Sequence, residues 1–252
     1  RAIGSALDDA WFTSTAASIV ATVEGSRATW QSWHVRAEAQ RRARAASIPS
    51  AQLEDAVGRL VATALGDHSV PLAVPTDGIS EPAALQRVDG QSVYTVAGAE
   101  WFTSPRILAA EQRLVEAAGR SDGKMVDPAT VDLALLETAA NGVELNAGQV
   151  ALVRAMACSG ARVQVAIAPA GSGKTTAMRA LARAWTDAGG TVVGLAPSAA
   201  AAAALGDQID THTDTLAKLT WSLAQDDLPD WAAHIGPTTL VVIDEAGMAD
   251  TL

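Results

Sequence analysis

The apolar positions divide the chain into a helical first part and a last part in which helices alternate with strands. Up to about residue 65, two sets of apolar residues keep the three-to-four-residue spacing of a helix face. These sets are Trp30, Trp33 and Ala37, and Leu53, Val57, Leu60 and Val61. We therefore expect residues 1–65 to be mainly helical.

Turn-forming residues mark the middle of the chain. Residues 66–90 are rich in proline and glycine, which predicts a linker, and a short extended piece is expected over 92–96. Two helices are then predicted, because each has a capping residue followed by proline at its start and glycine or asparagine near its end. Their start signals are Ser104 with Pro105 and Asp127 with Pro128, and their end signals are Gly119 and Asn141 with Gly142.

From residue 143 the apolar runs become shorter and alternate with helical patterns. We expect a helix over Asn146–Cys158, a helix over Thr175–Ala188 after a glycine-rich loop, and three strands. The predicted strands are Val163–Ala168, Thr191–Leu195 and Thr239–Ile243. Strands that alternate with helices indicate an α/β fold with a parallel sheet covered on both faces.

Composition excludes several classes of protein. No apolar run is long enough to span a membrane, so we expect no membrane segment. The single cysteine, Cys158, allows no intrachain disulfide and suits a reducing cytoplasm, which is the expected location. A net charge of −10 argues mildly against nucleic-acid binding, although a local groove could still hold a single strand.

A glycine-rich loop between a predicted strand and a predicted helix is the strongest chemical signal. Such a loop turns its backbone amides toward phosphate groups, and the helix N-terminus adds positive potential. Lys174 is expected to reach the β- and γ-phosphates of ATP, and the Thr175 hydroxyl is expected to ligate Mg²⁺. The first glycine usual in such loops is replaced by Ala168. The expected nucleotide-binding residues of the loop are Pro169, Ala170, Gly171, Ser172, Gly173, Lys174, Thr175 and Thr176.

Two adjacent carboxylates follow the last predicted strand. Asp244 would lie at the C-terminal tip of that strand, where open α/β sheets bind ligands. It is expected to hold Mg²⁺, while Glu245 orients and deprotonates the attacking water. Together with Lys174, these two residues form the predicted catalytic set.

Gln149 allows two interpretations. It lies three residues after Asn146, so the pair could form a capping box at the start of a helix. Alternatively, its amide could contact the edge of adenine. The sequence does not separate these interpretations, and both can hold.

Five segments in this order resemble the motifs of superfamily 1B helicases of the RecD-like group, and more narrowly the helicase part of MobF-type (TraA/TrwC-like) conjugative relaxases. They are Leu145–Gln149, the phosphate loop, Leu195–Ala200, Thr213–Leu219 and Val242–Met248. The resemblance implies that four residues contact single-stranded DNA: Pro197, Ser198, Thr215 and Lys218. Where the family often has histidine, this chain has Ala217.

The resemblance also implies an organisation and an activity. We expect a helical linker region over 1–90, a small helical pre-motor domain over 91–142, and over 143–252 an incomplete RecA-like P-loop domain. The activity implied for the whole protein is ATP hydrolysis coupled to movement on single-stranded DNA, with conjugation proteins as possible partners. Because the chain ends soon after Glu245, we expect a fragment that is inactive by itself.

Two other functions remain open at this point. A P-loop phosphotransferase would use the same loop, but it would need a lid with catalytic arginines. A non-catalytic remnant would bind nucleotide or partners without turnover.

Overall fold

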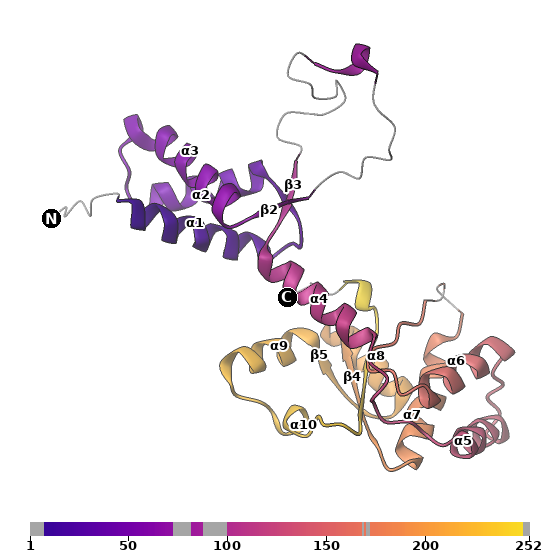
Figure 1. Ribbon diagram of the computed structural model, residues 1–252. Helices are drawn as coiled ribbons and strands as arrows, with labels where there is room; N and C mark the ends of the chain where they lie inside the picture. Colours follow the sequence, from indigo (N-terminus) through magenta and orange to yellow (C-terminus); the bar gives the residue numbers. More distant parts are fainter. Residues whose placement is uncertain (1–7, 73–81, 88–99, 168, 170–171, 249–252) are drawn as a thin grey trace. The chain divides into compact units, whose positions relative to one another are not determined.

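A computed structural model describes residues 8–72, 82–87, 100–167, 169 and 172–248 of the chain (Figure 1). The chain divides into two compact units, with the division between Arg113 and Leu114. Each unit is described by itself below. The expected boundaries at residues 90 and 142 stay a prediction, and the first of them lies outside the described residues.

The first unit combines three helices with a small antiparallel sheet. Its helices are α1 (Asp9–Glu24), α2 (Ser32–Ala45) and α3 (Ser50–Asp67), and its strands are β1 (Trp30–Gln31), β2 (Val70–Leu72) and β3 (Trp101–Thr103). The strands are ordered β1-β3-β2. A short 3-10 helix, η1, covers Ala83–Leu85. The helical character expected for residues 1–65 is therefore confirmed over the described part, apart from β1.

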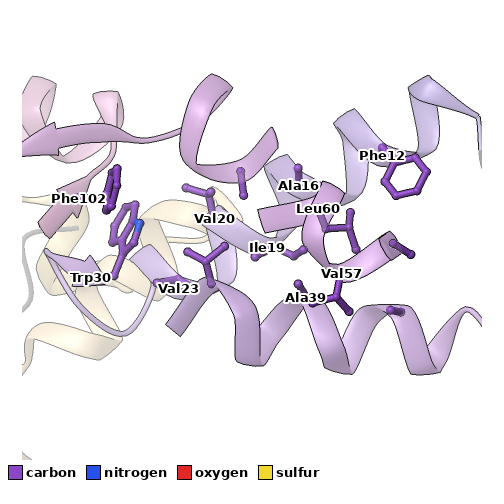
Figure 2. Packing of buried hydrophobic residues seen from close by; sticks show 14 of the residues in the cluster. Phe12, Ala16, Ile19, Val20, Val23, Trp30, Ala39, Val57, Leu60 and Phe102 are labelled. Atoms are coloured by element: carbon purple, nitrogen blue, oxygen red, sulfur yellow. The ribbon is translucent and has the colours of Figure 1, made fainter. Parts of the chain in front are cut away.

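The core of the first unit is formed by one apolar face of each helix together with residues of the sheet (Figure 2). Ile19 from α1 and Val57 and Leu60 from α3 are fully buried in it. The apolar face predicted for residues 53–61 is confirmed, since Leu53 and Val61 pack against the same cluster.

The helical face predicted through Trp30, Trp33 and Ala37 is wrong. Trp30 lies in β1 directly opposite Phe102 of β3, and its side chain is fully buried (Figure 2). Trp33 is 58% exposed on α2, whose buried face is formed by other residues, among them Val35 and Ala39. A strand partner about 70 residues away is not visible in local spacing, so the tryptophan spacing was misleading.

The linker predicted over residues 66–90 is wrong at its start. α3 continues to Asp67, and Val70–Leu72 form a strand that pairs with β3. Residues 73–81 and the extended piece expected over 92–96 lie outside the described residues.

The second unit contains the predicted alternation of helices and strands. Its elements are α5 (Pro128–Ala140), α6 (Ala147–Cys158), α7 (Lys174–Asp187), β4 (Thr191–Ala196), α8 (Ala199–Ile209), β5 (His212–Thr215), α9 (Leu216–Gln225), α10 (Asp230–Ala233), β6 (Thr239–Ile243) and the 3-10 helix η2 (Ala246–Met248). Helix α4 (Pro105–Ala118) spans the division between the units.

The predicted helix ends are confirmed where capping residues defined them. The Ser104 hydroxyl accepts from Ile107 N at the start of α4. Asp127 accepts from Ala129 N at the start of α5, and Gly142 follows the end of α5 with a left-handed backbone (φ 81°). These signals are local, which is why the sequence predicted them well.

The second sheet is parallel, with strand order β5-β4-β6. Helix α7 contacts β4 and β6, and α5 and α6 pack on α7. The buried face of α7 is rich in alanine, including Ala177, Ala180 and Ala184, which lets these helices approach closely. The predicted α/β fold with a parallel sheet, preceded by a mostly helical region, is confirmed. Strand β5 was not predicted.

The strand predicted over Val163–Ala168 is not formed over residues 163–167, while Ala168 lies outside the described residues. Val165 is 78% and Ile167 is 94% exposed. The start of this segment is bound elsewhere, because Arg162 N donates to Arg120 O and the Arg162 guanidinium pairs with Asp122. Among the residues that the structure describes, no strand pairs with residues 163–167, and an apolar pattern by itself does not make a strand.

None of the described helices is both long and apolar enough to cross a bilayer.

Candidate nucleotide-binding site

Three of the predicted site segments follow the C-terminal ends of parallel strands. In the register of the sheet, Ala196 of β4 lies opposite Thr215 of β5, and Leu195 of β4 lies opposite Ile243 of β6. The residues that follow these positions therefore lie along one edge of the sheet. They include Pro197, Ser198 and Asp244, and Thr215 itself is the last residue of β5.

Helix α7 is held so that its N-terminus points to the same edge. At its C-terminal end, the indole of Trp185 donates to Thr238 O at 2.9 Å, next to the first residue of β6. Thr191 N, at the start of β4, donates to the same carbonyl at 3.3 Å. A helix of this length extends about 21 Å, close to the length of a six-residue strand at about 3.3 Å per residue. The start of α7 therefore lies near the level at which β4 and β6 end.

The phosphate loop enters α7 through a left-handed residue. Gly173 is the N-cap of α7 with φ 75°, a conformation that residues other than glycine rarely adopt. No side chain of the described residues caps this helix start. The Ser172 hydroxyl is buried and has no hydrogen-bond partner among the residues that the structure describes. The loop thus presents a helix N-terminus whose amide groups suit an anion.

The remaining loop residues are placed as follows. Lys174 is the first residue of α7, and its Nζ donates to Pro169 O at 3.4 Å, a long bond. Thr175 and Thr176 follow in the first helical turn and are half-buried. Ala168, Ala170 and Gly171, which the sequence also assigned to the loop, lie outside the described residues.

Asp244 continues the hydrogen bonding between β6 and β4 by one residue beyond the end of β6. Its backbone N–H donates to Leu195 O at 3.0 Å, and its Oδ1 accepts from Glu245 N at 2.9 Å. Glu245 then adopts a left-handed backbone with φ 52°, and its side chain is exposed. Such a conformation in a residue other than glycine costs free energy and is often found at functional sites.

The donor set fits a magnesium nucleotide. Mg²⁺ takes oxygen ligands, and the Thr175 hydroxyl and the Asp244 carboxylate are the side chains expected to supply them. The ammonium of Lys174 and the N-terminus of α7 suit the charge of a triphosphate. These metal and nucleotide contacts remain predictions.

Gln149 forms the predicted capping box at the start of α6. Its N–H donates to Asn146 Oδ1 at 3.0 Å, and its Oε1 accepts from Asn146 N at 2.8 Å. In addition, its Nε2 donates to the carbonyls of Ser172 and Gly173, each at 3.1 Å. The capping interpretation is confirmed, and the adenine contact stays a prediction.

The two residues expected to contact DNA after β4 also have local roles. Ser198 is the N-cap of α8, and its hydroxyl accepts from Ala201 N at 3.2 Å. Ser198 is exposed, and Pro197 is half-buried beside it. A cap at an exposed helix start is compatible with a contact to a phosphate backbone, which stays a prediction.

The residues expected to contact DNA after β5 are part of a small polar group. The Thr215 hydroxyl caps α9 by accepting from Lys218 N at 3.1 Å, and Lys218 Nζ lies 2.8 Å from Asp214 Oδ2. Burial by itself would raise the pKa of Asp214. Hydrogen bonds from Lys218 and from Thr215 N outweigh it, so the pKa lies below its ordinary value. Asp214 therefore holds Lys218 in a defined position at the edge.

Sequence reasoning missed two features of this edge. The pairing of Asp214 with Lys218 could have been found from their four-residue spacing, which favours ion pairs where a helix starts. The hydrogen bonds from Gln149 to the phosphate loop join positions that are 23 and 24 residues apart, and no local sequence pattern predicts such bonds.

Comparison with known proteins agrees with this geometry. Residues 144–252 match the family model described as an AAA domain, which covers less than half of the chain. No curated protein matches the chain. The matched range contains the phosphate loop, the parallel sheet and the Asp244–Glu245 pair. Residues 144–252 are therefore a P-loop NTPase domain with an α/β fold of the RecA-like type.

Proposed function

We propose that the chain is the ATP-binding part of a DNA helicase of the RecD-like type, within a MobF-type conjugative relaxase. One observation supports the proposal: the bond from Trp185 to Thr238 holds the C-terminal end of α7 at the start of β6, so that the N-terminus of α7 would be directed toward the ends of β4, β5 and β6. This edge gathers the residues expected for phosphate, metal and DNA. A motor needs these functions close together, because the closure of the protein around the nucleotide must change its contacts with the DNA strand.

The chain's own residues would act on ATP in distinct ways. The amides at the start of α7 and the Lys174 ammonium would hold the phosphates. Thr175 and Asp244 would hold Mg²⁺, which neutralises charge that develops on the phosphate oxygens. The Glu245 carboxylate would accept a proton from the attacking water.

The DNA strand would lie along the ends of β4 and β5. Ser198 and Thr215 offer hydroxyl groups and exposed helix starts, and Lys218 offers a positive charge fixed by Asp214. Such contacts address the phosphate backbone, so they bind a single strand without reading its sequence. Conjugation proteins as partners, a cytoplasmic location and the division into parts 1–90, 91–142 and 143–252 belong to the same proposal.

The test measures binding of Mg-ATP by calorimetry and of a fluorescent oligo-dT strand by anisotropy at several salt concentrations. Lys218→Gln should weaken DNA binding and lower the slope of log affinity against log salt by about one. Arg183→Gln is the control, because it removes one positive charge from the last turns of α7, where Arg183 pairs with Asp187.

The outcomes separate the parts of the proposal. Binding of ATP without any binding of DNA would contradict the helicase assignment and leave a P-loop NTPase. Equal loss in the two variants would show that DNA contacts the protein by general charge attraction and would contradict the assigned strand path.

A further inference from the structure

We propose that the outer face of the small sheet in the first unit is a second binding site for single-stranded DNA, in which bases stack on Trp33 and Trp101 and the Arg27 guanidinium binds a phosphate. The inference rests on the proposed function for the presence of a DNA strand. The residues of this site differ from those along the ends of β4 and β5, and they belong to the other unit.

The strand register puts Gln31, Trp101 and Leu72 in one row across the outer face of the sheet. Trp101 of β3 lies opposite Gln31 of β1 and also opposite Leu72 of β2. Successive residues of a strand point to opposite faces. Trp30 and Phe102 take the core face, where both are buried (Figure 2), so the row belongs to the other face. There, Trp101 is 45% and Leu72 is 37% exposed.

Trp33 extends this row by one aromatic ring. Its indole Nε1 donates to Gln31 Oε1 at 2.9 Å, which holds the ring beside the row. The indole stacks on the imidazole of His34, with the ring centroids 3.4 Å apart. Trp33 is nevertheless 58% exposed, so much of the ring is open to a flat ligand. A ring that is already held in place loses little conformational entropy when a base stacks on it.

Arginines supply positive charge beside Trp33. Burial, and after it the charge of Arg27, lowers the pKa of His34, so Arg27 lies close to the imidazole that stacks on Trp33. Arg27 is exposed, and no ion pair holds it within the part of the chain that the structure describes. Arg36, one turn after Trp33 on α2, pairs with Glu54. A guanidinium has five N–H donors, so Arg36 keeps donors for a phosphate as well.

This combination of rings and charge fits a single strand of DNA. Its bases expose their aromatic faces, and stacking of a base on an aromatic side chain tolerates any sequence. Arginine is a common donor to the phosphate oxygens. Each nucleotide brings both an aromatic face and a negative charge, whereas a protein partner that covered the rings would have to bring a separate carboxylate for Arg27. The surface therefore favours a nucleic-acid strand.

The stacking is tested on the full chain by fluorescence anisotropy, with a labelled oligo-dT strand and an abasic strand of the same length. Trp33→Ala and Trp101→Ala each remove one ring. Trp33→Phe keeps a ring but loses the bond to Gln31. Leu136→Ala is the control, because it removes an exposed apolar side chain from α5 of the other unit. Circular dichroism and thermal melting check that each variant is folded.

The phosphate contact is tested with Arg27→Gln at several salt concentrations. Arg44→Gln is the matched control, because Arg44 is also exposed but lies about 16 Å from Trp33 along α2. Arg27→Gln should lower the slope of log affinity against log salt by about 0.7, the value for one phosphate of a single strand. Arg44→Gln should leave the slope unchanged, and an equal change in both variants would contradict a phosphate bound at Arg27.

Each tryptophan-to-alanine variant should weaken binding of the oligo-dT strand about tenfold and leave binding of the abasic strand within about twofold. Trp33→Phe should stay within about threefold of the unaltered chain, because a phenyl ring still stacks. Equal losses for the two strands, or an equal loss in Leu136→Ala, would overturn the stacking role.

Comparison with Lys218→Gln separates this inference from the proposed function. Loss of DNA binding in Lys218→Gln, with none in the tryptophan variants, would overturn the second site and leave the strand path along β4 and β5. Loss in the tryptophan variants alone would support the second site and contradict that path. If the unaltered chain binds neither strand, both the second site and the path fail.

Discussion

The indole Nε1 of Trp185 donates a hydrogen bond to Thr238 O at 2.9 Å, across 53 residues of sequence. The bond ties the last turn of α7 to the residue before β6. A Cβ on Gly190 would lie 2.4 Å from Trp185 Cδ1, so the turn after α7 closes tightly on the same ring. This contact holds the C-terminal end of α7 beside the start of β6.

Trp185→Phe should destabilise the chain by about 1–2 kcal/mol, because the aromatic packing largely remains while the Thr238 carbonyl loses its indole donor. Denaturant unfolding monitored by circular dichroism measures the change. Trp221→Phe is the control, since that ring on α9 is 61% exposed. Equal effects in the two variants would show that the indole bond contributes nothing specific.

Lys174→Ala should weaken Mg-ATP binding at least tenfold, about 1.4 kcal/mol, because it removes a positive charge from the phosphates. Calorimetry measures the dissociation constant. Lys124→Ala is the matched control, since Lys124 Nζ bonds to Ala188 O beyond the other end of α7. Unchanged binding in Lys174→Ala would refute the assignment of the phosphate loop.

In the whole helicase of which this chain is proposed to be the ATP-binding part, Glu245→Gln should leave ATP binding within about twofold and reduce hydrolysis strongly, because general-base catalysis is worth about 10²–10⁴-fold. Phosphate release and calorimetry on the same preparations provide the two readouts. Loss of binding together with unchanged turnover would contradict the role proposed for Glu245.

Glu245→Gly should stabilise the folded chain by about 0.5–1 kcal/mol, although it removes the catalytic carboxylate. The reason is the left-handed backbone at this position, with φ 52°, which glycine adopts without strain. Thermal or denaturant unfolding measures the gain, and Glu245→Ala serves as comparison because it keeps the Cβ. If the two variants unfold alike, the backbone at position 245 is not strained.

Asp214 should make folding stability depend on acid pH. Its pKa is lowered in the folded chain by its hydrogen bonds with Lys218 and Thr215 N, despite the opposing effect of burial. A lowered pKa means that the folded state favours the charged form. The stabilisation is therefore complete above the ordinary aspartate pKa and is lost as the pH falls through the lower folded value.

Asp214→Asn should remove this contribution, which is on the order of 1 kcal/mol or less for a partly exposed pair. Its unfolding free energy should fall less than that of the unaltered chain between pH 7 and acid pH. Parallel pH profiles of the two proteins would show that Asp214 is not held by its neighbours.

The sequence by itself determined the features that depend on neighbouring positions. Asp127 with Pro128 and Asn146 with Gln149 marked helix starts, because a cap is satisfied within three residues of itself. The glycine-rich loop before Lys174 indicated a P-loop domain for the same reason, because the backbone conformation of such a loop depends on residues that are adjacent in the sequence. The strand over residues 239–243 was predicted because its apolar run is continuous.

Only the tertiary structure decided the features that need a distant partner. Trp30 is a strand residue that pairs with Phe102, and residues 163–167, which follow Arg162 in its contacts with Arg120 and Asp122, do not form a strand. The bonds from Gln149 to the loop likewise join two separate elements. Pairing across many residues depends on which backbone groups and side chains the fold brings together, and local spacing carries no information about that choice.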